Sequence, residues 1–236
     1  MEPVVHLRSA VSLLGRFPAL AGVDLDVAEG EIVLLRGPNG AGKTSLLRTC
    51  AGLLPVSSGE AVVLGHDLTV DRAAVRPLVG LLGHATFLYD ELTVADNVRF
   101  WARAARSDAA DAEAALVALG LDGRLRDVAV ARLSTGQRRR ASIATMVARR
   151  PELWLLDEPH AGLDAEARDI VDALVRQAVT QGATVIVASH ERERADALAG
   201  RAVAITGGVI ESDGAQADGA QADGAEADDA EVTGVA

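Results

Sequence analysis

Short apolar runs, each ending at glycine or polar residues, recur along the chain. Four are rich in Val, Ile and Leu: "EIVLLRG" at 31–37, "AVVLG" at 61–65, "LWLLDEP" at 153–159 and "TVIVASH" at 184–190. Runs of this length and composition predict buried strands. We expect each strand to end in a functional loop, since ligands gather at the carboxyl edge of open α/β sheets.

Helix-favouring stretches lie between these runs. They are "KTSLLRTCAGLL" from Lys43, "AEARDIVDALVRQAVT" from Ala165, and a long region from about residue 94 to 150. Pro151 disfavours helical geometry at the residue before it, so the last helix of that region should end near Arg150. The alternation predicts an α/β core, residues 1–83 and 151–210, with a mostly helical subdomain inserted at 84–150.

Composition narrows the class of protein. Hydrophobic residues make up 49% of the 236 positions but aromatics only 3%, so the core must be built from Val, Leu, Ile and Ala. No apolar run approaches the roughly 18 residues that span a bilayer. Cys50 is the single cysteine, which excludes an internal disulfide and favours a reducing cytoplasm.

The acidity of the chain is concentrated at its end. The net charge is −11, and residues 211–236 hold eight of the 34 acidic residues and no Lys or Arg, which leaves 26 acidic against 23 basic residues. The segment 214–228 repeats "GAQADGAQADGAEAD" without a large apolar side chain, so we expect 211–236 to be a disordered acidic tail. It is either a solvated extension or a regulatory segment. The nearly neutral remainder offers no nucleic-acid footprint, so we expect no nucleic-acid partner.

A phosphate-binding loop is the strongest motif. "GPNGAGKT" satisfies G-x-x-x-x-G-K-[ST] between a predicted strand and a predicted helix; a chance glycine-rich turn is the alternative, and this context disfavours it. Lys43 should reach the β- and γ-phosphates of ATP, and the Thr44 hydroxyl should bind Mg²⁺. The nucleotide-binding residues are predicted to be Gly37, Pro38, Asn39, Gly40, Ala41, Gly42, Lys43, Thr44 and Ser45.

Two further strand ends carry candidate catalytic groups. Asp157 and Glu158 follow four apolar residues, which favours Mg²⁺ binding by Asp157 and a general-base role for Glu158 over a solvated acidic pair. His190 ends "TVIVASH" beside the same edge. A structural histidine is the alternative there, but the position favours a contact with the γ-phosphate or with Glu158.

The order of "GPNGAGKT", "LSTGQ", "LWLLDEP", "AGLD" and "ASH" resembles the nucleotide-binding subunits of ATP-binding cassette (ABC) transporters over about residues 3–210. The resemblance implies a P-loop NTPase core with a mostly parallel sheet, an N-terminal antiparallel β portion and an inserted helical subdomain. It also implies that the "LSTGQ" turn, with Ser134, Gly136 and Gln137, caps ATP held by a second subunit. Ser134 and the backbone N–H groups at this helix start suit a phosphate. A head-to-tail homodimer would then enclose two Mg-ATP, with Asp164 of "AGLD" at the interface.

Three positions depart from the family pattern. Thr135 stands where glycine is commoner. His84 stands where the family usually carries a glutamine that contacts the metal-bound water, which predicts an ATPase rate sensitive to pH near about 6 to 7. Leu14 stands where an aromatic stacks on adenine, with Phe17 nearby as a substitute, so selectivity for ATP over GTP is open.

The arginines 138–140 have two interpretations. A solvated helix face with local ion pairs is favoured, and assistance in attracting phosphate is the alternative.

Several functions remain open beyond ATP hydrolysis. A cassette of this kind implies separate integral membrane subunits docked near residues 84–98, which would place the chain at the cytoplasmic face of the cell membrane as a peripheral subunit. The segments "GLLGH" and "ELTVADNVRFWARAA" look most like exporter ATPases of the haem-exporter type used in cytochrome c maturation. A drug- or lipid-type exporter, a soluble non-transport cassette ATPase and a kinase with the same phosphate loop are the alternatives.

Overall fold

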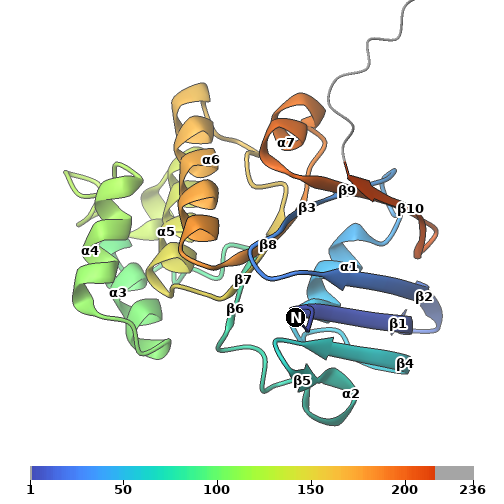
Figure 1. Cartoon of the computed structure of the whole chain (residues 1–236). Helices are drawn as coiled ribbons and strands as arrows, with labels where there is room; N and C mark the ends of the chain where they lie inside the picture. Colours follow the sequence, from blue (N-terminus) through green and yellow to red (C-terminus); the bar gives the residue numbers. More distant parts are fainter. Residues whose placement is uncertain (1, 216–236) are drawn as a thin grey trace, which may run out of the picture.

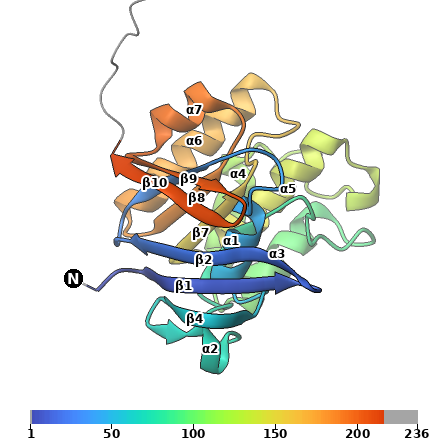
Figure 2. The same ribbon diagram turned by 90° about the vertical axis from the view of Figure 1, so that its right-hand side faces the viewer.

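Two β-sheets pack on opposite sides of one helix, α1 (Lys43–Cys50), and further helices cover the other face of the larger sheet (Figures 1 and 2). The computed structural model describes residues 2–215. Leu46, Leu47 and Cys50 of α1 are fully buried in the core between the sheets. A second core joins the larger sheet to the helices on its other side.

The larger sheet has six strands in the order β10-β9-β3-β8-β7-β6, and all but β10 run parallel. Its central strands consist almost entirely of buried Val, Ile and Leu because helices or the second sheet cover both faces. The predicted strands at 31–37, 153–159 and 184–190 belong to it. The strands are β3 (Ile32–Arg36), β6 (Val79–Leu82), β7 (Leu153–Asp157), β8 (Thr184–Ala188), β9 (Arg201–Thr206) and β10 (Val209–Ala215).

The smaller sheet is antiparallel, in the order β2-β1-β4-β5. Burial alternates along much of β1, where Val5 and Leu7 are fully buried. The predicted strand at 61–65 is the end of β4 and lies in this sheet. The α/β class, with a mostly parallel sheet and an N-terminal antiparallel portion, is confirmed. The elements here are β1 (Val5–Leu14), β2 (Phe17–Val27), β4 (Val56–Val63), β5 (His66–Asp67) and the short helix α2 (Leu68–Asp71).

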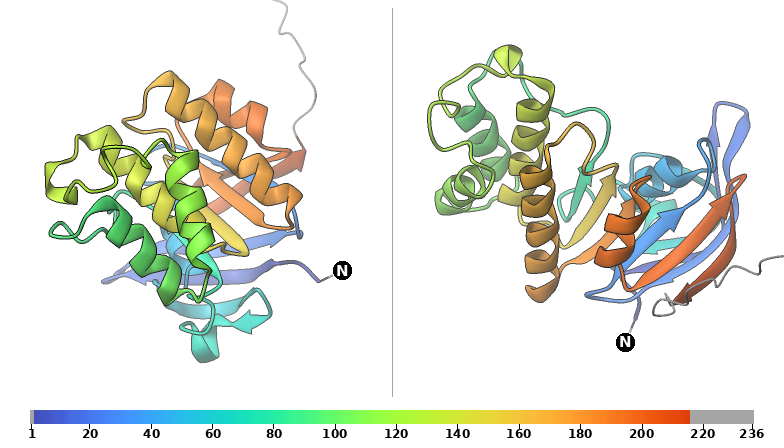
Figure 3. Two further views of the ribbon diagram at one scale, coloured as in Figure 1. Left: turned by 90° about the vertical axis from the view of Figure 1, so that its left-hand side faces the viewer. Right: turned by 90° about the horizontal axis from the view of Figure 1, so that it is seen from above.

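Three helices pack against one another beside the larger sheet, as the view from above shows (Figure 3). They are α3 (Val94–Ala104), α4 (Ala109–Ala118) and α5 (Thr135–Ala148), joined through the 3₁₀ turn η1 (Val130–Arg132). Helix α5 ends two residues before Arg150, close to the predicted end. Helices α6 (Ala165–Thr180) and α7 (Arg192–Leu198) follow β7 and β8. Within residues 2–215, no helix is both long enough and apolar enough to cross a membrane.

The acidic tail begins later than predicted. Residues 211–215 belong to β10, which pairs antiparallel with β9, so the prediction of disorder from residue 211 is wrong for these positions. The edge of β9 offers unpaired backbone groups to the incoming segment, and Asp213 lies 3.0 Å from Nε of Arg201. The rest of the predicted tail, 216–236, lies outside the described residues.

Candidate active site

A cavity of about 890 Å³ opens at the carboxyl edge of β3, β7 and β8. Its lining comes from segments far apart in the sequence: the β1–β2 hairpin, the phosphate loop, the loop after β6, the start of α5, the segment after β7, the loop after β8, and the turn between β9 and β10. The edge of the sheet at which ligands bind in α/β folds is therefore where the predicted motifs converge.

The phosphate loop leads directly into α1. Gly37 has a φ of +148°, and a Cβ there would lie 2.0 Å from the carbonyl oxygen of Ile205, so only glycine fits. Helix α1 begins without a side-chain cap, which leaves its first N–H groups available to an anion. Nζ of Lys43 donates to the carbonyls of Gly37 and Pro38 at 2.6 and 3.0 Å. The lysine is thus held at the loop that it is predicted to serve.

Thr44 and Asp157 meet beside this loop. The Thr44 hydroxyl donates to Oδ2 of Asp157 at 2.7 Å, although the residues are 113 positions apart. A hydroxyl and a carboxylate at one point are the hard oxygen ligands that Mg²⁺ takes together with phosphate oxygens and water. The two residues therefore fit the predicted metal ion.

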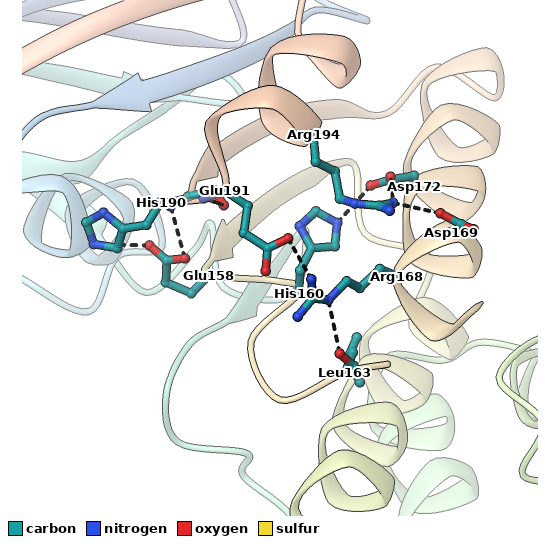
Figure 4. Close-up of polar contacts among 10 residues, drawn as sticks. Glu158, His160, Leu163, Arg168, Asp169, Asp172, His190, Glu191 and Arg194 are labelled. Atoms are coloured by element: carbon teal, nitrogen blue, oxygen red, sulfur yellow. Dashed lines mark hydrogen bonds and ion pairs between the residues drawn. The ribbon is translucent and has the colours of Figure 1, made fainter. Parts of the chain in front are cut away.

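Glu158 and His190 also come together, from β7 and β8. The backbone N–H of His190 donates to Oε2 of Glu158 at 3.2 Å, and the ring Nε2 lies 3.4 Å from Oε1 (Figure 4). Apart from this ion-pair contact with His190, buried Oε1 accepts no hydrogen bond from the described residues. Since Glu158 lines the cavity, its carboxylate retains capacity to accept a hydrogen bond from water.

Arg139 is the residue that the sequence reasoning missed. It is 7% exposed, so the interpretation of 138–140 as a uniformly solvated face is wrong at its centre. Its guanidinium donates to the carbonyls of Gly83 at 2.6 Å, Asp157 at 3.0 Å and Glu158 at 2.6 Å. Burial lowers the pKa of Arg139, and the nearby carboxylates of Asp157 and Glu158 partly oppose that shift.

The neighbouring arginines differ from Arg139. Arg138 pairs with Asp90 at 2.6 Å on the surface, and Arg140 donates to the carbonyl of Leu119 at 3.3 Å. The three arginines lie on one helix but at different angles around it, so only the middle one points into the molecule.

The "LSTGQ" turn forms the start of α5. Oγ of Ser134 accepts from the N–H of Gln137 at 3.3 Å, and Oε1 of Gln137 accepts from the N–H of Ser134 at 3.0 Å, a reciprocal capping box. Thr135 lines the cavity, whereas Ser134, Gly136 and Gln137 are not among the residues lining it. Ser134 is exposed.

The remaining predicted residues lie on the rim or the surface. His84 is exposed and lines the cavity. Leu14 and Phe17 line its other end and are 52% and 79% exposed. Asp164 is exposed and caps α6 by accepting from the N–H of Ala167 at 2.8 Å.

A glycine-rich loop between a buried strand and a helix, with threonine, aspartate and glutamate at the same sheet edge, defines a nucleotide-binding P-loop protein. The family of ABC transporters matches residues 20–161, which is more than half of the chain. The chain belongs to the ABC transporter family, and it is an ATPase of that family.

Known proteins similar to this chain include both an export and an import ATP-binding protein. The cytochrome c biogenesis ATP-binding export protein CcmA of Rhodopseudomonas palustris is 44% identical over 170 residues, covering 72% of this chain and 83% of the relative. The sulfate/thiosulfate import ATP-binding protein CysA of Caulobacter vibrioides is 38% identical over 222 residues, covering 89% of this chain and 64% of the relative. A dimeric ATP-binding cassette in a post-hydrolysis state with ADP and Pi has the same fold, with a TM-score of 0.81, 24% identity, and coverage of 89% and 98%.

Proposed function

We propose that this chain hydrolyses ATP to drive export through separate integral membrane subunits, and that the exported compound is haem for cytochrome c maturation. The observation that supports the ATPase site is the convergence of Lys43, Thr44, Asp157, Glu158 and His190 at one sheet edge. The relative CcmA, an export protein of cytochrome c biogenesis, supports the cargo.

The proposed chemistry assigns one task to each group. Lys43 and the first N–H groups of α1 bind the phosphates of ATP, with the rest of the loop, Gly37–Ser45, around them. Thr44 and Asp157 hold Mg²⁺, which neutralises charge on the phosphates when bound.

Attack on the γ-phosphate requires an oriented water. The carboxylate of Glu158, whose Oε1 lies 3.4 Å from Nε2 of His190, accepts a proton from the attacking water. His190 lies beside this carboxylate and contacts the γ-phosphate, and His84 on the rim stands where the water around the metal is expected. Charge on the transferred group is stabilised by Lys43 and by the helix start rather than by a covalent intermediate.

A second copy of the chain completes each site in this proposal. Ser134 and Asp164 are both exposed and lie at helix starts, and Ser134 does not line its own cavity. Ser134, Gly136 and Gln137 of each copy would face the ATP of the other, so that ATP forms part of the dimer interface. Loss of the γ-phosphate on hydrolysis then removes contacts to both copies and loosens the dimer.

The test is to trap the ATP-bound state in the native host. Glu158→Gln should bind ATP and barely hydrolyse it, so the variant is purified from membranes with ATP and Mg²⁺, and the proteins that accompany it are identified. Multispanning membrane proteins together with a haem absorption band are expected. Glu158→Gln combined with Lys43→Ala is the matched control, since it should lose ATP and therefore the trapped complex.

Other outcomes would show whether haem export or transport itself is the wrong part of the proposal. Membrane subunits with a periplasmic solute-binding protein and no haem would contradict haem export and favour import, as carried out by the relative CysA. Ribosomes, nucleic acid or a soluble dimer alone would contradict transport altogether while leaving the hydrolysis chemistry intact.

A further inference from the structure

A buried polar network lies behind the segment that carries Glu158 (Figure 4). His160, two residues after Glu158, is 1% exposed, and Asp172 of α6 is 5% exposed. Nε2 of His160 lies 2.8 Å from Oδ1 of Asp172, whose other oxygen accepts from Arg194 of α7 at 2.5 Å. Arg194 also donates to Asp169 at 2.9 Å. The network is thus anchored on two helices.

The hydrogen bond to Asp172 fixes the imidazole of His160. An ionised carboxylate only accepts, so Nε2 carries the shared proton. The other ring nitrogen, Nδ1, is buried and has no hydrogen-bond partner among residues 2–215. Removing the imidazole would take away the donor that Oδ1 of this buried carboxylate has in the structure.

The same histidine sits within a tightly turned backbone. Glu158 has a φ of +49°, a left-handed conformation that a glutamate keeps only where its surroundings hold it. The N–H of Glu158 donates to the carbonyl of Ala188 at 2.8 Å, and its own carbonyl accepts from Ala161 at 3.1 Å. The carbonyl of His160 accepts from Leu163 at 3.1 Å. The imidazole is therefore the side-chain anchor in the middle of two consecutive turns.

A second pair of contacts ties the end of this segment to the loop of His190. Arg168 of α6 donates to the carbonyl of Leu163 at 3.0 Å and to Glu191 at 3.2 Å, and Glu191 directly follows His190 (Figure 4). The turns after Glu158 are consequently held from α6 and α7 together.

We propose that His160 is a positioning residue for ATP hydrolysis: through Asp172 and Arg194 it holds the turns after Glu158, and thereby keeps the Glu158 carboxylate beside His190. This inference rests on the proposed general-base role of Glu158. His160 is not among the residues that line the cavity, so it would act through the backbone of the segment. Its loss should therefore reduce kcat and spare ATP binding, since a small misplacement of a reacting group slows chemistry far more than it weakens binding.

The experiment compares His160→Leu, His160→Gln and His160→Asn in the full chain. Leucine fills similar space without a donor. Glutamine can place its amide nitrogen near the position of Nε2 and reach Asp172, whereas asparagine is too short to do so. We expect Leu and Asn to lower kcat about ten- to a hundredfold, with the Kd for ATP within about twofold of wild type, and Gln to restore most of the rate. Rates are divided by the fraction of protein that binds ATP.

The controls distinguish misfolding, failure of this inference, and failure of the general-base role of Glu158. His6→Leu removes another histidine bonded to an aspartate, Asp26 at 2.7 Å, on the antiparallel sheet, and should leave kcat unchanged. If His160→Leu fails to fold, the comparison of Gln with Asn decides: equal rates overturn the inference. A fall in kcat matched by an equal loss of ATP affinity also overturns it. Undiminished hydrolysis by Glu158→Gln would instead refute the general-base role, whatever the His160 variants do.

Discussion

We assign Ser134 two roles, capping α5 and contacting ATP bound by a second copy, and two substitutions distinguish them. In the structure its hydroxyl caps α5 by accepting from the N–H of Gln137. Ser134→Ala removes that cap at a cost of about 1 kcal/mol. For a domain of this size the cost corresponds to a Tm lower by roughly 2 to 4 °C. Ser134→Asp keeps a side-chain acceptor at the cap and should retain the Tm.

The rates of ATP hydrolysis of the three proteins should rank in a different order from their stabilities. If Ser134 of one copy donates to the γ-phosphate bound by the other, losing that charge-assisted bond costs about 1.5 to 3 kcal/mol, or roughly 10- to 150-fold in rate. Aspartate places a negative charge at the same point, so Ser134→Asp should be slower than Ser134→Ala. Stability is thus expected to rank wild type and Asp above Ala, and hydrolysis to rank wild type above Ala above Asp.

Thermal unfolding, ATP binding and ATP hydrolysis of the three proteins provide the assay. ATP binding through the Lys43 loop should persist in all of them. If the Asp variant recovers both stability and hydrolysis, Ser134 serves only as a helix cap, and the reasoning that places it against a partner's nucleotide is refuted.

Three further predictions follow from single positions. His84→Gln tests the pH sensitivity expected from a histidine at this position and should flatten the pH dependence of the ATPase rate near about pH 6 to 7; pH-rate profiles that superimpose would contradict this. Arg139→Met should lower the free energy of unfolding in urea by about 2 to 4 kcal/mol, since it removes three hydrogen bonds from a buried guanidinium to backbone carbonyls, whereas Arg138→Met, at a surface ion pair, should cost less than about 1 kcal/mol. Gly37→Ala should abolish ATP binding in a fluorescent-nucleotide titration, because its Cβ would overlap the carbonyl of Ile205; binding at wild-type affinity would show that the loop can rearrange.

Periodicity and local chemistry predicted the helices and strands that are determined by residues close to one another in the sequence. Helix α6 begins at Ala165, where the sequence placed it, because Asp164 caps it and the apolar positions recur at helical spacing. Strands β7 and β8 are short buried runs in the positions expected. The convergence of Lys43, Thr44, Asp157, Glu158 and His190 followed from where those runs end.

Strands and side-chain roles that depend on partners distant in the sequence were not predicted. β6 is only "VGLL", too short to stand out, and it forms because β7 offers it an edge. β10 contains acidic residues, as does the segment that follows it in the sequence. It forms because it pairs with β9 and because Arg201 contacts Asp213. Arg139 and His160 have unremarkable neighbours in sequence; their roles come from carbonyls and a carboxylate 12 to 56 positions away.

The turn between β9 and β10 bears on the order of events during synthesis. The N–H of Gly208 donates to the carbonyl of Ala41 in the phosphate loop at 2.8 Å, and the carbonyl of Gly208 accepts from Ala21 of β2 at 2.8 Å. The phosphate loop is thus braced by a residue that is translated long after it. Because contacts of such long sequence separation form late, a nascent chain on the ribosome holds an unfinished phosphate loop until residue 208 has emerged. Nucleotide capture therefore follows the folding of the turn between β9 and β10, and chains that stop before this turn would draw little on the ATP pool of the cell.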